Sequence, residues 1–269
     1  MNNLLMQLKA LSFNLFDGTF KTDASINAKG SIPELGMNLE INNLNTQRMA
    51  ESQMTFAKNT VKGIVSARMN LGGKGLNRSE INSGWRGNGQ FTLKDASFSS
   101  IDIGKQIKTG LIDKLPDMLK SKVRIKDSLL DWHGDYSALV AKFNLQNGTL
   151  QLADLDGKAV ENKGMDLKGS GHVSIVDYSM DLNCDFIDRY QLLGQGMPKD
   201  KRYNAPAISA HLTGSLSSPK YDWGHTLEQL AKSAASDTLK EKGRDTLKKQ
   251  VENLGVPEGA KNLLKGLFN

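Results

Sequence analysis

The chain has 269 residues, a formal net charge of +6 and 38% hydrophobic residues. No apolar run reaches the roughly 18 residues that a membrane span needs, and the N-terminus lacks the features of a secretory signal. The lysines are scattered among acidic residues, and the aromatic-plus-glycine signatures of RNA readers are missing, so we expect no nucleic acid as partner. The lone Cys184 excludes an internal disulfide and a four-cysteine metal site.

Apolar and polar residues alternate through the first 45 residues, which predicts three strands. The first runs from Leu4 to Phe16 and meets a hairpin signal at Asp17-Gly18. The second begins near Phe20, and the third carries Met37, Leu39 and Ile41 on one face. We expect an edge strand that begins at residue 4 to be left without its predecessor.

The next segments are predicted as a helix near 46–60, a strand at 64–71, a flexible Gly- and Asn-rich loop at 72–89 and one or two strands at 89–103. A helix near 102–119 follows, because Ile103, Ile107, Leu111 and Leu115 recur at helical spacing. Pro116 is expected to kink or end it. The apolar stripe of this helix has two possible roles: packing on the sheet, or covering an exposed apolar groove.

The strongest pattern lies between Leu139 and Phe186, where alternation with period two is broken only by short Gly, Asn and Asp turns. Near its end, Tyr178, Met180 and Leu182 share one face with Cys184 and Phe186. Further strands are predicted at 123–130 and 208–216. Beyond Pro219 the composition becomes helical, and the basic, Leu- and Phe-rich end either docks on its own domain or lies on a membrane surface.

Catalytic and metal-binding patterns are missing from the sequence. The four histidines, His133, His172, His211 and His225, show no metal-ligand spacing, and no GxSxG motif is present. The acidic residues at 17, 154, 156 and 166 are expected mainly at turns. We therefore assign no catalytic residue, no metal site and no cofactor, and expect a protein that is not an enzyme.

Several loose motifs, in order, resemble the C-terminal part of AsmA-like proteins over roughly residues 85–225. They are a G-x-G strand entry at Gly87 to Ala96, an N-G hairpin at Asn147-Gly148, a strand at Gly169 to Ile175 and a final G-x-L-x-x-P at Gly214 to Pro219. The resemblance implies an envelope protein that is held in the inner membrane by an N-terminal helix, has its bulk in the periplasm, and works in phospholipid passage or outer-membrane assembly. The membrane anchor and most groove repeats of that family are absent here, so we expect either a fragment or a short relative that depends on a partner.

The expected fold is mainly β with α: a curved antiparallel sheet, forming an open groove or half-barrel, with amphipathic helices and a helical C-terminal tail. Residues 1–222 are the predicted AsmA-like sheet domain and 223–269 the tail. The expected partners are phospholipid and a membrane surface or envelope proteins. In the resulting hypothesis, the apolar groove binds acyl chains, and Ile107, Leu111 and Leu115 cover one end. The groove candidates are Phe143, Leu145, Leu150, Leu152, Val173, Ile175, Met180, Leu182 and Phe186.

A structural alternative stays open. The same alternation suits a β domain with a closed core that serves as a scaffolding piece in membrane-protein assembly, and then the apolar face is packed by the chain's own helices.

Overall fold

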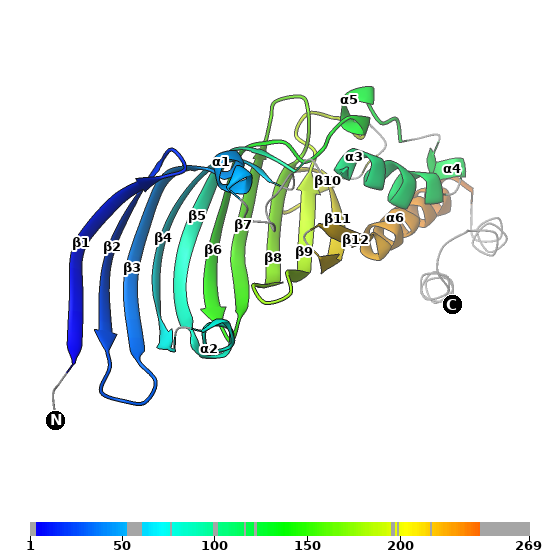
Figure 1. The fold of residues 1–269 in the computed structure, drawn as a ribbon. Helices are drawn as coiled ribbons and strands as arrows, with labels where there is room; N and C mark the ends of the chain where they lie inside the picture. The colour runs from blue at the N-terminus through cyan, green and yellow to red at the C-terminus, as the bar shows by residue number, and fades with distance from the viewer. Residues whose placement is uncertain are drawn as a thin grey trace.

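The computed structural model contains one twelve-stranded antiparallel sheet that is curved and is not closed into a barrel (Figure 1). It describes residues 4–52, 61–75, 77–98, 102–115, 117–120, 123–194, 197, 199–215 and 217–242. The first nine strands pair in sequence order, β9 then pairs β11, and β11 also pairs β10 and β12. The predicted fold class is confirmed.

The strands of this sheet are mostly long. Their bounds are β1 Leu5–Leu15, β2 Gly18–Asn27, β3 Glu34–Asn45, β4 Lys62–Lys74, β5 Arg86–Ser97, β6 Tyr136–Gln146, β7 Thr149–Ala159, β8 Asp166–Ser174, β9 Ser179–Ile187, β10 Lys199–Asp200, β11 Ala205–Ser215 and β12 Ser218–Asp222.

Tight turns and bulges shape the sheet. At the N-G turn, Asn147 and Gly148 both have positive φ, as a type I′ hairpin requires. The first hairpin turns one residue earlier than predicted, at Phe16 and Asp17. The pairings of β1 with β2 and of β3 with β4 contain bulges, with left-handed residues at Ala10 and Asn43. Because bulges bend strands and increase twist, they help to curve the sheet.

Two short helices lie at the strand ends. Helix α1 spans Thr46–Glu51 and begins at an Asn45 N-cap, whose side chain accepts hydrogen bonds from the N–H groups of Gln47 and Arg48. The rest of the predicted helix near 46–60 includes residues 53–60, which lie outside the described residues. Helix α2, Arg78–Gly84, forms inside the segment predicted as a flexible loop, so that prediction was wrong. A reciprocal capping box between Asn77 and Glu80 begins this helix.

The segment predicted as one amphipathic helix is helical but irregular. It consists of α3 Ile103–Gln106, a π-helical turn η1 Ile107–Leu111 and a 3₁₀ turn η2 Ile112–Lys114, and a separate helix α4 covers Asp117–Lys120. The backbone is extended at Leu115, which ends the run, while Pro116 lies outside the described residues. The predicted helical character of this segment is therefore confirmed, but the segment is not one regular α-helix.

The predicted strand at 123–130 is not formed. Residues 123–126 lie outside the sheet, with an extended backbone at Lys126, and helix α5 covers Asp127–Leu130. The Lys126 N–H donates to the Leu192 carbonyl at 2.8 Å, so this segment bonds to a loop. Val123 and Leu129 are buried in the core, which accounts for the apolar pattern without a strand.

The C-terminal part of the sheet ends in a helix. Helix α6 spans Gly224–Lys242 and lies beside the last strands (Figure 1). Leu230 and Ala231 are buried, and residues 243–269, most of the predicted tail, lie outside the described residues. No helix in the described part of the chain is both long and apolar enough to cross a membrane.

Candidate functional site: the apolar face of the sheet

One face of the sheet is apolar along its whole width. The strand register aligns a continuous row of non-polar residues across ten strands, one from each. The row is Phe13, Phe20, Ile41, Ala67, Phe91, Ala141, Leu155, Gly169, Cys184 and Ala210. Polar residues such as Lys21, Glu40 and Arg68 occupy the intervening positions and face the other way.

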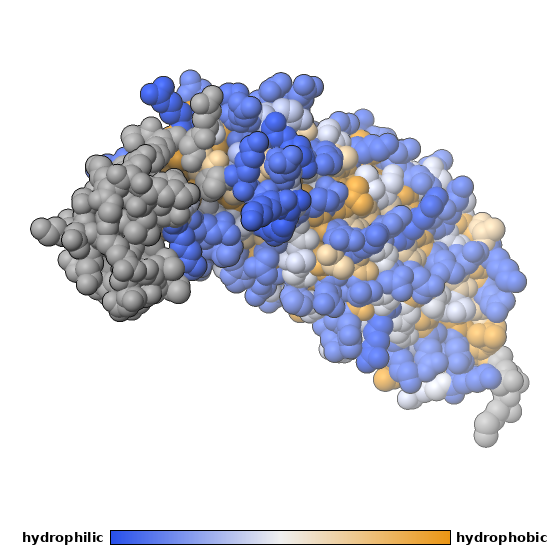
Figure 2. Space-filling view, turned by 180° about the vertical axis from the view of Figure 1, so that it is seen from behind, coloured by the Kyte–Doolittle hydropathy of each residue, from blue (hydrophilic) through white to orange (hydrophobic). Residues whose placement is uncertain are grey.

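Exposure of this face is high on β1 and low on β6 and β9, although it does not fall evenly from strand to strand. Phe13 on β1 is 44% exposed, Phe20 and Ile41 are half-buried, and Ala141 and Cys184 are 0% and 3% exposed. The face is thus open to solvent at the β1 end and covered at the β11 end. Figure 2, seen from behind, shows hydrophilic residues over most of the visible face and hydrophobic ones between them and towards the end away from the helices.

The predicted groove residues fall mainly in the covered part. Six are buried: Phe143, Leu145, Leu152, Met180, Leu182 and Phe186. Leu150 and Val173 are half-buried on the same face, and Ile175 is half-buried just beyond the end of β8. Tyr178, grouped with this face by the sequence pattern, instead occupies the turn before β9 with positive φ and is 37% exposed. Whether the nine candidates contact lipid stays a prediction.

Glycines help to bury large side chains on this face. Gly89 on β5 lies opposite Phe143 of β6, and a Cβ placed at Gly89 would lie 2.7 Å from the phenyl ring. Gly157 on β7 likewise sits beneath the ring of Tyr136, with a Cβ distance of 2.9 Å. Because these glycines have no side chain, the rings can lie over the backbone of the neighbouring strand.

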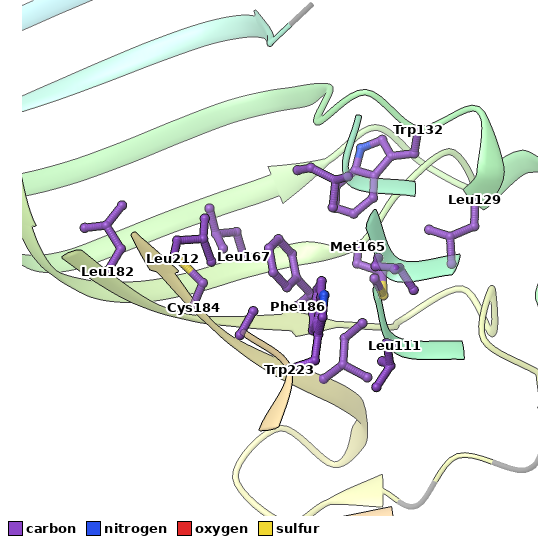
Figure 3. Close-up of a cluster of buried hydrophobic side chains, with 14 of the residues drawn as sticks. Leu111, Leu129, Trp132, Met165, Leu167, Leu182, Cys184, Phe186, Leu212 and Trp223 are labelled. Atoms are coloured by element: carbon purple, nitrogen blue, oxygen red, sulfur yellow. The ribbon is translucent and has the colours of Figure 1, made fainter. Parts of the chain in front are cut away.

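The three residues that were predicted to cover one end of the groove lie in the helical segments over the sheet or directly at their end. Ile107 and Leu111 are fully buried and Leu115 is 3% exposed, all within the main hydrophobic cluster. Gly110 packs so closely on Trp223 that a Cβ there would lie 2.7 Å from the indole Nε1. Figure 3 shows Leu111 beside Trp223 and Phe186, with Trp132 and Leu129 further along the cluster.

A chain of aromatic rings runs through this covered end. Trp132 contacts both Tyr136 and Phe186 edge-on, with ring centroids 5.8 and 6.1 Å apart. Phe186 in turn packs on Trp223, which stacks on Tyr221 at 5.7 Å. Such rings bury large apolar areas in defined geometry, so this end is a well-packed core.

Several polar atoms are enclosed with these rings. The hydroxyls of Tyr136 and Tyr221 and the Nε1 of Trp223 are buried without a hydrogen-bond partner among the described residues. Burial raises the pKa of Tyr136 and of Tyr221 above the ordinary tyrosine value. Burial, with a smaller effect of Asp185, also raises the pKa of the Cys184 thiol to about 12, which makes it a poor nucleophile at neutral pH.

The opposite, polar face carries a hollow of about 830 Å³ over β6–β9 and β11. Ion pairs cross its floor, with Lys168 Nζ 2.6 Å from Asp156 Oδ2 and Lys142 Nζ 3.6 Å from Asp154 Oδ2. Asp154 and Asp156 lie within strand β7, whereas the sequence predicted them at turns. At the rim, the hydrogen bond from Arg202 lowers the pKa of Asp200. The charged residues of this hollow largely neutralise one another.

Two of the four histidines, His211 and His225, line the polar hollow, whereas His133 and His172 do not. His211 Nε2 lies 2.8 Å from Asp181 Oδ1 at the polar hollow, and His225 bonds to Gln229. Within the part of the chain that the structure describes, no group of three or more His, Cys, Asp or Glu side chains is placed to hold a metal ion.

Comparison with known proteins leaves the family open. No protein-family model, curated protein or solved structure matches the chain.

The groove residues predicted from the sequence lie at the covered end of the apolar face, and none of the exposed residues at its open end was among them. The exposed side chains there include Met6, Leu8, Leu11 and Phe13 on β1. Their alternation was visible in the sequence, but the sequence carried no signal that these strands, in contrast to 139–186, would lack a covering layer.

Proposed function

We propose that the chain is a non-enzymatic lipid-binding protein of the AsmA-like type. It holds phospholipid acyl chains against the apolar face of its sheet and supports lipid transfer or outer-membrane assembly, in the periplasm at the inner membrane. The observation that carries the proposal is the apolar row that crosses ten strands and stays exposed at the β1 end. The resemblance of its motifs to AsmA-like proteins supports the envelope location.

The physical driving force is burial of methylene groups. Each CH₂ removed from water contributes about 0.8 kcal/mol, so ten methylenes contribute about 8 kcal/mol. The half-buried residues Leu39, Ile41 and Met69 on β3 and β4 offer the contact surface. Part of this energy is offset by the lost freedom of the bound lipid. No specific polar group is needed for such binding, and head groups remain in solvent.

Binding of a fluorescent phospholipid tests the proposal. The full chain is delipidated and titrated with NBD-labelled phosphatidylethanolamine, whose emission rises in an apolar environment. Leu39→Asp places a charge on the apolar face of β3, while Asn38→Asp places the same charge on the next residue, which faces the polar side. Loss of a leucine contact is worth about 1.5–3 kcal/mol, so Leu39→Asp should weaken binding by about tenfold or more.

The control variant should bind within about twofold of the wild type, since surface changes rarely exceed 0.5 kcal/mol. Circular dichroism checks that both variants stay folded. A wild-type chain that binds no labelled lipid, or equal losses in the two variants, would count against a lipid-binding apolar face.

A second function is favoured by the burial of the predicted groove residues. Phe186, Leu182 and Met180 are at most 7% exposed and belong to the main hydrophobic cluster. This suits a structural β domain with a closed core that acts as a scaffolding piece in membrane-protein assembly. Mass spectrometry of the freshly purified chain separates the two: co-purified phospholipid supports the first function, and its absence together with no binding of labelled lipid supports the second.

A further inference from the structure

Strand β1 is a long apolar edge. All eleven of its residues are exposed, and in the described part of the chain it pairs only with β2. Eleven large hydrophobic side chains of the described residues are exposed, and seven of them belong to residues 4–15. Lys9 is the only charged residue in that segment. Natural edge strands are usually shortened, charged or covered, so an edge of this kind favours the addition of another strand.

The backbone groups that face the free edge follow from the pairing with β2. Near the start, the Leu4 carbonyl accepts a hydrogen bond from the Ala28 N–H at 2.9 Å. In an antiparallel pair, the backbone N–H and C=O groups of successive residues point in alternate directions. The backbone groups of Leu4, Met6 and Leu8 therefore point towards β2. The N–H and C=O groups of Leu5 and Gln7 then point to the free edge.

The bulge changes this alternation in the second half of the strand. Leu8 lies opposite Ala24 and Leu11 opposite Thr22, so the extra residue falls at 9–10. The two-residue turn makes Leu15 and Gly18 a hydrogen-bonded pair, which places Ser12 and Asn14 with their backbone groups at the free edge. Odd-numbered residues thus face the edge before the bulge and even-numbered ones after it.

With this alternation, β1 can pair with a second copy of itself in an antiparallel register that aligns the two bulges. If a second copy lies antiparallel with its Leu11 opposite Leu8, Gln7 lies opposite Ser12 and Leu5 opposite Asn14. Every residue whose backbone groups face the free edge then meets another of the same kind. The bulges of both copies fall together at the centre. A register shifted by one residue loses these hydrogen bonds and sets apolar side chains opposite polar ones.

The same register matches the side chains. On the apolar face, Met6 lies opposite Phe13 and Leu4 opposite Leu15, and the two-fold symmetry repeats each pair. The two Lys9 residues approach each other near the centre. The Asp23 carboxylate accepts the Ala10 N–H at 2.7 Å, so negative charge lies beside each of them.

We propose that β1 is a self-association edge, through which two copies of the chain pair β1 antiparallel to β1 about a two-fold axis. Pairing joins the two sheets into one, covers the exposed side chains of residues 4–15, and doubles the length of the apolar face. The helical segments that cover each sheet then lie at its two far ends (Figure 1). This association does not depend on lipid binding.

Cysteine cross-linking tests the register. Leu8→Cys and Leu11→Cys are made separately in the full chain, where the native Cys184 is buried. In the proposed dimer these two positions form a non-hydrogen-bonded pair, whose Cβ atoms lie within disulfide reach. Under mild oxidation a mixture of the two variants should give a disulfide dimer that contains one of each, several-fold more than either variant alone. Equal or absent cross-linking overturns the register.

A proline at the edge tests the association itself. Gln7→Pro removes an N–H that points away from β2 and adds a ring that obstructs the edge, whereas Gln7→Ala keeps the N–H. By sedimentation velocity over a concentration series, the wild type and Gln7→Ala should dimerise with similar Kd, and Gln7→Pro should raise the Kd by about tenfold or more. Circular dichroism establishes that the proline variant is folded. A wild type that stays monomeric, or that needs another protein to occupy β1, overturns the proposal.

Discussion

The difference between the covered and the open end of the apolar face can be measured with two methionines. Met180 on β9 is 7% exposed, whereas Met6 on β1 is 49% exposed, and both lie on the apolar face. We expect Met180→Asp to lower the free energy of unfolding by about 4 kcal/mol or more. About 2 kcal/mol of this is lost apolar burial, and the rest is the cost of burying a carboxylate.

The matched variant Met6→Asp should cost less than about 0.5 kcal/mol, because the new carboxylate stays in water. Urea unfolding of the full chain, followed by tryptophan fluorescence, measures both values; Trp132 and Trp223 are buried at 1% and 3% exposure and report on the core. The measurements are made at a protein concentration at which the wild type is monomeric. Equal losses of unfolding free energy in the two variants would refute the difference in burial between β9 and β1. Two large losses would mean that the apolar face is covered throughout, and two small losses would mean that the helical segments do not cover β9.

Two further predictions concern buried polar groups. Asp188, 1% exposed, accepts hydrogen bonds from the backbone N–H groups of Tyr190, Leu192 and Leu193, so Asp188→Ala should cost about 3 kcal/mol in urea unfolding and Asp188→Asn less; a neutral alanine variant would contradict this. The pKa of Cys184 is raised to about 12 from the ordinary 9.0, so its thiol stays neutral in the folded state while it ionises in the unfolded one. Its contribution to stability is therefore present below pH 9.0 and is lost above it, by at most about 1.4 kcal/mol per pH unit. The urea midpoint of Cys184→Ala should fall less steeply between pH about 9 and about 11, and an unchanged slope would disprove it.

The two main errors of the sequence-based prediction have different physical origins. The segment 123–130 alternates like a strand, yet it bonds to a loop through Lys126 because the sheet order already pairs β5 with β6. The segment 72–89 has the composition of a loop, but Asn77 and Glu80 form a capping box that begins α2. The first error arises from a contact between residues far apart in the sequence. The second arises because a local capping signal, which is visible in the sequence, outweighs the loop-like composition of the segment.

The sequence predicted that the candidate site is an apolar sheet face, but it did not predict which part of that face is buried and which is exposed. Period-two alternation identified which residues share a face: Phe143, Leu152 and Leu182 lie in one row across the sheet, with Gly171 between the two leucines. Their burial depends on neighbours distant in the chain, such as Leu111 and Trp223 in the same cluster. The ion pair between Lys168 and Asp156 likewise requires the register of β7 and β8.

The sequence by itself determined the one-sided character of the strands and most hairpin turns, because alternation and turn chemistry are local properties of the backbone. Only the tertiary structure decided that one apolar face runs from β1 to β11, and that helical segments cover one end while β1 stays exposed. Burial is a property of the packed layers: Phe13 and Phe186 occupy similar positions in similar patterns, yet one is 44% exposed and the other 1%. The covering layer accounts for that difference, and its place depends on contacts between residues far apart in the sequence.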